Sequence, residues 1–117
     1  MYQKIVLIDE RPQSWNTLKR LHWRQWHDEV ERVKWLVLAA LGGSVQPIAG
    51  RVGITVTVFY KARPHDASNI PAKLYEDGLV AAGLLTDDNP AYVASMTTRP
   101  MVDRQRPRVE IEIQEER

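Results

Sequence analysis

Side chains that can bind a divalent metal and a phosphate group gather in the stretch from residue 63 to residue 89. An acid follows a predicted strand, two polar residues open a predicted helix, a lysine lies one turn into it, and an acidic pair follows its end. These residues are Asp66, Ser68, Asn69, Lys73, Asp87 and Asp88. Mg²⁺ and Mn²⁺ prefer carboxylates with further oxygen ligands. A metal held in this way activates water for phosphodiester hydrolysis, and a nearby lysine offsets charge that develops on the phosphate.

The order of these residues resembles the signature of the RusA-type Holliday-junction resolvases, particularly the short members carried by phages and prophages. That signature is Asp-x-Asp-Asn-Leu at a helix start, then a lysine one turn later and an Asp-Asp pair after the helix. Here it reads Asp66-Ala67-Ser68-Asn69-Ile70, followed by Lys73, Asp77 and Asp87-Asp88.

The resemblance extends upstream and covers roughly residues 5 to 113. The family's first loop has a Pro-x-Ser-x-Asn-like pattern, and phage members enter their long helix through His-Trp-Arg. The matching residues are Pro12, Ser14, Asn16 and His22-Trp23-Arg24.

The resemblance implies a Mg²⁺-dependent, structure-specific endonuclease that resolves Holliday junctions or other branched DNA in DNA recombination and repair, with Mn²⁺ as a further possible metal. The metal ligands it implies are Asp66, Asp87 and Asp88, with Ser68 as a neutral ligand. The catalytic residues it implies are Asp66, Asp88 and Lys73.

Ser68 stands where the family has its second signature acid. A hydroxyl can coordinate Mg²⁺ but supplies no charge. Two hypotheses follow, an active nuclease and a catalytically weakened or inactive relative that binds branched DNA or a protein partner. A small dimeric module without a DNA role is a third, since the net charge of the chain is only +1.

Each feature of the stretch also has a purely structural interpretation. Asp87-Asp88-Asn89-Pro90 is typical of a turn, and Asp66 can cap a helix. Lys73 and Asp77 are spaced i, i+4 and can form a surface ion pair. Their joint occurrence in the order of the family favours a site derived from a nuclease.

Candidate DNA contacts lie mostly outside the acidic stretch. Lysine, arginine and asparagine side chains can contact phosphates and position a duplex. The candidates are Asn16, Lys19, Arg20, Arg24, Asn69, Arg99 and Arg104. Trp26 falls on the apolar face of a predicted helix and is expected in the core, whereas Trp15 and Trp23 are better candidates for a DNA or partner surface.

His65-Asp66 invites a comparison with the His-Asp phosphohydrolases, with His22 or His27 as further ligands. Those proteins are all-helical, whereas here the pair follows a strong strand pattern. His22 and His27 are also five residues apart, off the i, i+4 step of a helical metal pair. The sequence therefore disfavours this alternative.

Hydrophobic periodicity predicts the elements that position these residues. Strands are expected over 2–8, 51–61, 91–99 and 108–114, and helices over 21–41 and 69–82, with a loop over 9–17 and a turn over 100–107. The order β-α-β-α-β-β predicts one α/β (α+β) domain over residues 1–117, a small mixed sheet covered by two helices.

A helix over 69–82 would be about 20 Å long, so Asp66 and Asp88 would leave its opposite ends. They can share a metal only if the segment after Gly83 folds back, or if Asp88 meets Asp66 of a second subunit. The sequence therefore predicts a homodimer with the site at or near its two-fold axis, which would suit the two paired cuts of a four-way junction.

Composition excludes several classes of protein. The 117 residues include no cysteine, which rules out disulfide scaffolds, thiolate zinc sites and iron–sulfur clusters and favours the cytoplasm. No apolar run approaches the length of a membrane span. Residues 1–60 carry eight basic against five acidic residues, or +3, and residues 61–117 carry eight against ten, or −2. Carboxylates are thus concentrated in the second half of the chain.

Overall fold

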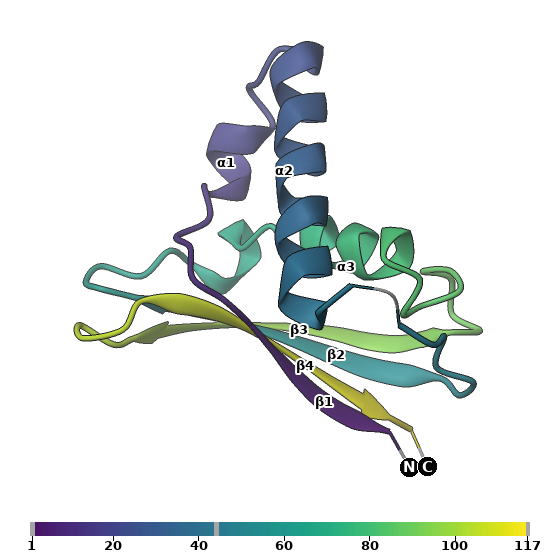
Figure 1. Cartoon of the computed structure of the whole chain (residues 1–117). Coiled ribbons are helices and arrows are strands. Elements are labelled where there is room, and N and C mark those ends of the chain that lie inside the picture. The colour runs from purple at the N-terminus through teal and green to yellow at the C-terminus, as the bar shows by residue number, and fades with distance from the viewer. Residues whose placement is uncertain (1, 44, 117) are drawn as a thin grey trace.

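The computed structural model describes residues 2–43 and 45–116, so Met1, Ser44 and Arg117 of the predicted domain lie outside the described residues. The strands within this part are β1 (Gln3–Ile8), β2 (Val52–Tyr60), β3 (Val93–Val102) and β4 (Arg108–Glu115). They form one mixed sheet with the spatial order β1-β4-β2-β3 (Figure 1). β2 and β3 are parallel, whereas β4 is antiparallel to both of its neighbours.

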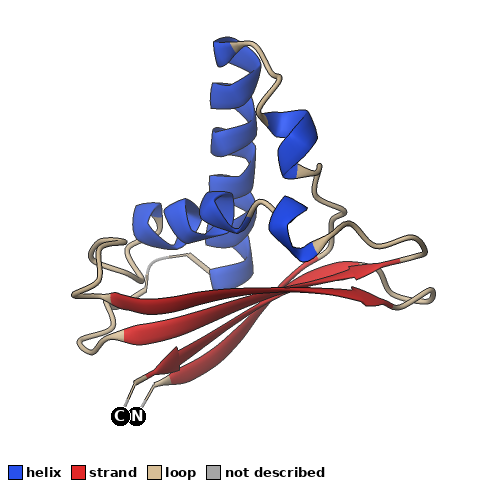
Figure 2. Cartoon of the chain, turned by 180° about the vertical axis from the view of Figure 1, so that it is seen from behind, coloured by secondary structure: helices blue, strands red, loops and turns tan. Residues whose placement is uncertain are grey.

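The helices lie on one face of this sheet and leave the other face uncovered (Figure 2). They are α1 (Trp15–Leu18), α2 (Trp23–Leu41), α3 (Ala72–Ala81) and a short 3₁₀ helix, η1 (Ala67–Asn69). α2 stands steeply on the sheet, with its N-terminal half beside α1 and clear of the strands (Figure 1). α3 packs against α2 close to the sheet.

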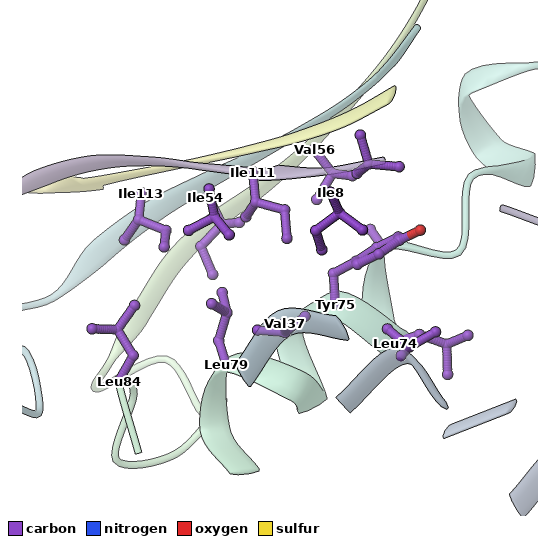
Figure 3. Close-up of a cluster of buried hydrophobic side chains, with 14 of the residues drawn as sticks. Ile8, Val37, Ile54, Val56, Leu74, Tyr75, Leu79, Leu84, Ile111 and Ile113 are labelled. Carbon is purple, nitrogen blue, oxygen red and sulfur yellow. The ribbon is translucent and has the colours of Figure 1, made fainter. Parts of the chain in front are cut away.

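Alternating apolar side chains of the strands form the core between the sheet and the helices (Figure 3). The buried apolar positions of β2 and β4 are Val52, Ile54, Val56, Val58, Tyr60, Val109, Ile111 and Ile113. Val37 of α2 and Leu79 of α3 are fully buried against them. The period-two pattern that predicted these strands therefore reflects one covered and one open face of the sheet.

The structure confirms a mixed α+β fold with a four-stranded mixed sheet. The predicted helix over 21–41 is present as α2 and ends where expected, at Gly42, whose φ of +82° favours glycine. In the described residues, no helix combines the length and the apolar character needed to cross a bilayer.

The predicted loop over residues 9–17 is wrong in its last part, because Trp15–Leu18 form α1. Ser14 caps this short helix, since its Oγ accepts a hydrogen bond from the Thr17 amide at 3.2 Å. A capped single turn is too short to show a helical period, which explains why the sequence pattern did not predict it.

The predicted start of the second long helix at Asn69 is also wrong, since α3 begins at Ala72. Ile70 is extended, with φ −77° and ψ 123°, because the ring of Pro71 disfavours a helical conformation in the residue before it. The preceding residues form η1 instead. The expected order of elements therefore gains two short helical pieces, α1 and η1.

The predicted turn over 100–107 is wrong at its start, because β3 continues through Pro100 to Val102. Pro100 pairs in register with Val58 of β2. β3 lies at the edge of the sheet, where a strand residue without an amide hydrogen is tolerated.

Candidate metal centre

Lys73 in the first turn of α3 lies at the centre of a group of three carboxylates. Its Nζ is 3.2 Å from Glu76 Oε1 and 3.0 Å from Asp77 Oδ1, and it also donates a hydrogen bond to Asp88 Oδ2. Glu76 and Asp77 reach the ammonium because residues three and four positions apart share one face of a helix. We call Lys73, Glu76, Asp77 and Asp88 the acidic cluster.

Asp88 reaches the acidic cluster because the chain reverses after α3. Gly83 has a φ of +88°, and the Leu84 amide then donates to the Leu79 carbonyl at 3.1 Å. This left-handed residue ends the helix and turns the chain back toward its start. Asp87 Oδ1 accepts from the Asp88 amide at 2.7 Å and orders the turn. Of the two alternatives drawn from the sequence, the chain after Gly83 does fold back, but it brings Asp88 to Lys73 and not into the same acidic group as Asp66.

Mutual attraction shifts the pKa values of this cluster in opposite directions. The hydrogen bond from Lys73 is the main cause that lowers the pKa of Asp88, and a hydrogen bond with Asp87 adds to it. Hydrogen bonds to Asp88, Asp77 and Glu76 raise the pKa of Lys73, although partial burial opposes the shift. Asp88 is therefore a carboxylate and Lys73 an ammonium at neutral pH.

The acidic cluster has a donor set that could bind a metal ion. One oxygen from each of Glu76, Asp77 and Asp88 lies within 4.8 Å of the others. Carboxylate oxygens suit hard divalent cations such as Mg²⁺ and Mn²⁺. The Asp77 and Asp88 side chains are 42% and 37% exposed, so an ion can approach from solvent, whereas the Glu76 side chain is only 11% exposed. Lys73 holds the central position, so a metal must displace its ammonium.

Three of the predicted ligands are not members of this cluster. In the described residues, the three-carboxylate group includes neither Asp66 nor Asp87. Asp66 is exposed at the start of η1, and its side chain makes no capping hydrogen bond. Ser68 is exposed and lines a small pocket of about 170 Å³ together with Lys73. Asp87 contacts the cluster through the Asp88 backbone.

Two carboxylates of the cluster were not predicted as ligands: Asp77 was expected only as a possible ion-pair partner of Lys73, and Glu76 was not selected at all. Its separation of ten residues from Asp66 gave no reason to choose it. The signal that could have found it is its i, i+3 spacing from Lys73, which places both side chains on one helical face.

A basic cleft lies at the end of the sheet where β2 finishes and the turn between β3 and β4 begins. Its volume is about 530 Å³, and its lining residues are Arg11, Lys61, Ala62, Arg63 and Arg104. Arg104 was predicted as a DNA contact, whereas Arg11, Lys61 and Arg63 were not. These residues come from three loops far apart in the sequence, so no local pattern links them.

The other predicted DNA contacts are distributed over two regions. Asn16, Lys19, Arg20 and Arg24 are exposed on α1, the turn after it and the first turn of α2. Asn69 ends η1, and Arg99 is exposed on β3 in register with Thr57. Trp15 and Trp26 are both partly buried and pack against the core, whereas Trp23 is 60% exposed.

Comparison with known proteins assigns no family to this chain. No family model matches the sequence, and no curated protein matches it. The interpretation of the acidic cluster as a functional site therefore rests on its geometry and on the order of its residues along the chain.

Proposed function

We propose that this chain is a divalent-metal-dependent, structure-specific DNA endonuclease that resembles the RusA-type resolvases and cleaves four-way junctions or other branched DNA. The observation that carries the proposal is the acidic cluster, in which Lys73 and Asp88 meet although fifteen residues separate them. Both were expected to be catalytic from the order of residues in the sequence. Their contact supports a common role.

The carboxylates of Asp77 and Asp88 would coordinate Mg²⁺ or Mn²⁺. The mostly buried Glu76 would provide the third carboxylate of the site. When bound, such a metal lowers the pKa of a coordinated water and so supplies a nucleophile at neutral pH. Asp88 contributes as an ionised carboxylate, since its pKa is lowered. The Lys73 ammonium, once released from the carboxylates, is free to pair with an oxygen of the phosphate and to stabilise its charge.

Asp66, Asp87 and Ser68 are proposed as further ligands that act when DNA is bound. Asp66 is exposed just before η1 and Ser68 is exposed on it, and Ser68 lines a pocket together with Lys73. A DNA phosphate that bridges this pocket and the cluster would bring the two groups of oxygen ligands onto one metal.

The basic cleft supports binding of the DNA backbone. Four cationic side chains around one concave surface attract phosphates whatever the base sequence. We expect Arg63→Gln to weaken junction binding and to reduce the slope of log K against log salt by about one, as the loss of one phosphate contact requires. Equilibrium binding measured over a range of salt concentrations tests this expectation.

A four-way junction offers two symmetry-related phosphodiesters, so a homodimer would present one acidic cluster to each. The homodimer remains part of the proposal. Its role changes, however, because the acidic cluster draws all four side chains from a single chain. A second subunit is required for paired cuts and not to complete the cluster.

The experiment that tests the function incubates the protein with a labelled four-way junction or a linear duplex, with Mg²⁺, Mn²⁺ or EDTA. We expect symmetric nicks in the junction that Asp88→Asn abolishes and that Asp28→Asn, an exposed acid on α2, leaves unchanged. Equal affinity for junction and duplex, with no cleavage of either, would contradict the proposal.

A second function, binding of branched DNA or a protein partner without cleavage, is favoured by one observation. Ser68 supplies no charge, and Lys73 already neutralises part of the acidic cluster. In that case the wild type binds the junction tightly without nicking it, and Ser68→Asp introduces cleavage. The same assay therefore separates the two functions.

A further inference from the structure

An aromatic hollow lies where α1 meets the first turns of α2, on the part of the molecule that stands clear of the sheet (Figure 1). Its volume is about 360 Å³, and its lining residues are Trp15, Leu18, Lys19, Leu21, Trp23 and Trp26. We propose that this aromatic hollow is a stacking site for a DNA base that has left its duplex next to the phosphate to be cut. The inference rests on the proposed function and adds to it the class of substrate, branched DNA with an unpaired or displaced base.

Packing holds two of the tryptophans that line the hollow in place, whereas the third is exposed to solvent. Trp15 and Trp26 pack edge to face, with ring centroids 5.8 Å apart and an interplanar angle of 76°, and both contact the core. Trp23 is 60% exposed at the first position of α2. A capping box orders that position, since His22 Nδ1 accepts from the Arg24 amide at 3.3 Å and Gln25 Oε1 accepts from the His22 amide at 3.2 Å. A large exposed aromatic ring on an ordered helix start can stack on a base without sequence preference.

The side chains around the hollow carry positive charge, which is complementary to the negative charge of a nucleotide. Residues 15–27 contain three cationic residues, Lys19, Arg20 and Arg24, and no carboxylate. In the described part of the chain, none of the three forms an ion pair. The Arg24 guanidinium lies 5.3 Å from the centroid of the Trp23 ring. Free cations beside aromatic faces are the combination that binds single-stranded DNA, because bases stack while their phosphates pair with the cations.

Trp15 joins the hollow to the candidate metal centre. Its side chain lines the aromatic hollow and also the small pocket that contains Ser68 and Lys73. A base in the hollow would therefore leave its own sugar and phosphate on the side of Lys73. The shared lining residue makes the hollow a neighbour of the pocket beside Lys73, and a branch point is where bases unstack at the lowest cost.

Trp35 provides a matched control within the same helix. It is also 60% exposed, and the Lys34 ammonium lies 5.3 Å from its ring centroid. It lies twelve residues after Trp23, about 18 Å along α2, and it does not line the hollow. Trp23→Ala and Trp35→Ala thus remove equally exposed rings from one helix.

The test measures binding in EDTA, so that cleavage cannot contribute, by fluorescence anisotropy of a labelled four-way junction with one unpaired thymine at its branch. We expect Trp23→Ala to weaken binding by about 5- to 100-fold, the effect of removing one stacked base, and Trp35→Ala to change it by less than about twofold. Trp23→Phe keeps an aromatic face and should retain most of the affinity. Equal effects of Trp23→Ala and Trp35→Ala, or no binding by the wild type, would overturn the inference.

A second readout locates the base directly. We expect 5-iodouracil in place of the unpaired thymine to photocrosslink to a peptide that contains Trp15, Trp23 or Trp26, and a crosslink elsewhere would contradict the stacking site. Failure of the proposed function can be distinguished from failure of the stacking site. In that case Mg²⁺-dependent nicks are absent while binding and crosslinking persist. Nicking that requires Asp88 but is indifferent to Trp23→Ala would instead sustain the function and overturn the stacking site.

Discussion

At the scale of single residues, the ion pairs of Lys73 decide how the acidic cluster responds to pH. The lowered pKa of Asp88 has the Lys73 hydrogen bond as its main cause. A carboxylate with a lowered pKa contributes stability above the pKa of the unfolded state and loses it as the pH falls through its folded value. The contribution of Asp88 is therefore lost in acid, below a pH of about 4.

Lys73→Met should raise the pKa of Asp88 toward that of a free aspartate, because the ammonium that favours its charged form is gone. The measurement is an NMR titration of the Asp88 side-chain carboxyl carbon. Lys34→Met, which removes a lysine paired with Glu31 on α2, is the matched control and should leave Asp88 unchanged. The same Lys73→Met substitution should also tighten Mn²⁺ binding, since the metal no longer competes with the ammonium.

Tyr75 and Glu10 form a buried contact that ties the N-terminal loop to α3. The Tyr75 hydroxyl donates to Glu10 Oε1, and Arg32 Nη1 donates to Glu10 Oε2 at 2.6 Å. The Glu10 side chain is 8% exposed. Burial and the adjacent Glu10 carboxylate raise the pKa of Tyr75. A raised pKa contributes stability below the unfolded pKa of tyrosine, about 10, and that stability is lost as the pH rises further.

Tyr75→Phe should destabilise the fold by about 1–3 kcal/mol at pH 7, because it leaves a buried carboxylate without one donor. It should also remove part of the alkaline loss of stability above a pH of about 10. Urea unfolding at pH 7 and at pH 11 measures both effects. Tyr92→Phe, outside this contact, is the control, and an equal effect of the two substitutions would contradict the role assigned to Glu10.

At the scale of elements, the contact between α2 and α3 depends on Gly78. A glycine inside a helix costs roughly 1 kcal/mol of helix propensity relative to alanine. Packing between the two helices opposes that gain at Gly78. A Cβ at Gly78 would lie 2.9 Å from Val37 Cγ2 and 3.1 Å from Val37 Cβ. Val37 is fully buried, so it has no free space to move into.

Gly78→Ala should therefore destabilise the protein, by about 1–3 kcal/mol, through overpacking between the two helices. The double variant Gly78→Ala, Val37→Ala should be more stable than the sum of the single effects predicts, because the shorter side chain removes the clash. Denaturant unfolding measures the free energy of unfolding of the wild type, the two single variants and the double variant, which together form a double-mutant cycle. Additive effects would show that the two positions are not in contact.

At the scale of the whole molecule, one chain supplies all four side chains of the acidic cluster. The prediction of a site at a dimer interface followed from a helix expected over residues 69–82, which would separate Asp66 from Asp88. α3 is shorter and begins at Ala72, and the chain folds back after Gly83. The carboxylates that could bind a metal therefore come together within one chain, without a second subunit.

The affinity for Mn²⁺ should accordingly be independent of protein concentration across any dimer–monomer transition. Calorimetric titration with Mn²⁺ at two protein concentrations, above and below the dissociation midpoint found by sedimentation equilibrium, measures this. Asp88→Asn should weaken binding at both concentrations. Metal binding that disappears with the dimer would place a ligand on the second subunit.

The sequence alone determined the presence and order of the four strands and of α2, because these follow from local patterns, while the resemblance suggested Lys73 and Asp88. Hydrophobic periodicity indicates which face of an element is buried, as the alternation in β2 and β4 and the helical period in α2 do. The order of Lys73 and Asp88 along the chain likewise pointed to a shared site.

Only the tertiary structure decided the start of α3, the entry of Glu76 into the cluster, the basic cleft and the sign of the effect of Gly78→Ala. Each depends on contacts between residues far apart in the chain or on a competing neighbour, such as Pro71 before α3. Periodicity reports the environment of a residue along its own element, whereas these features are set by which elements pack together.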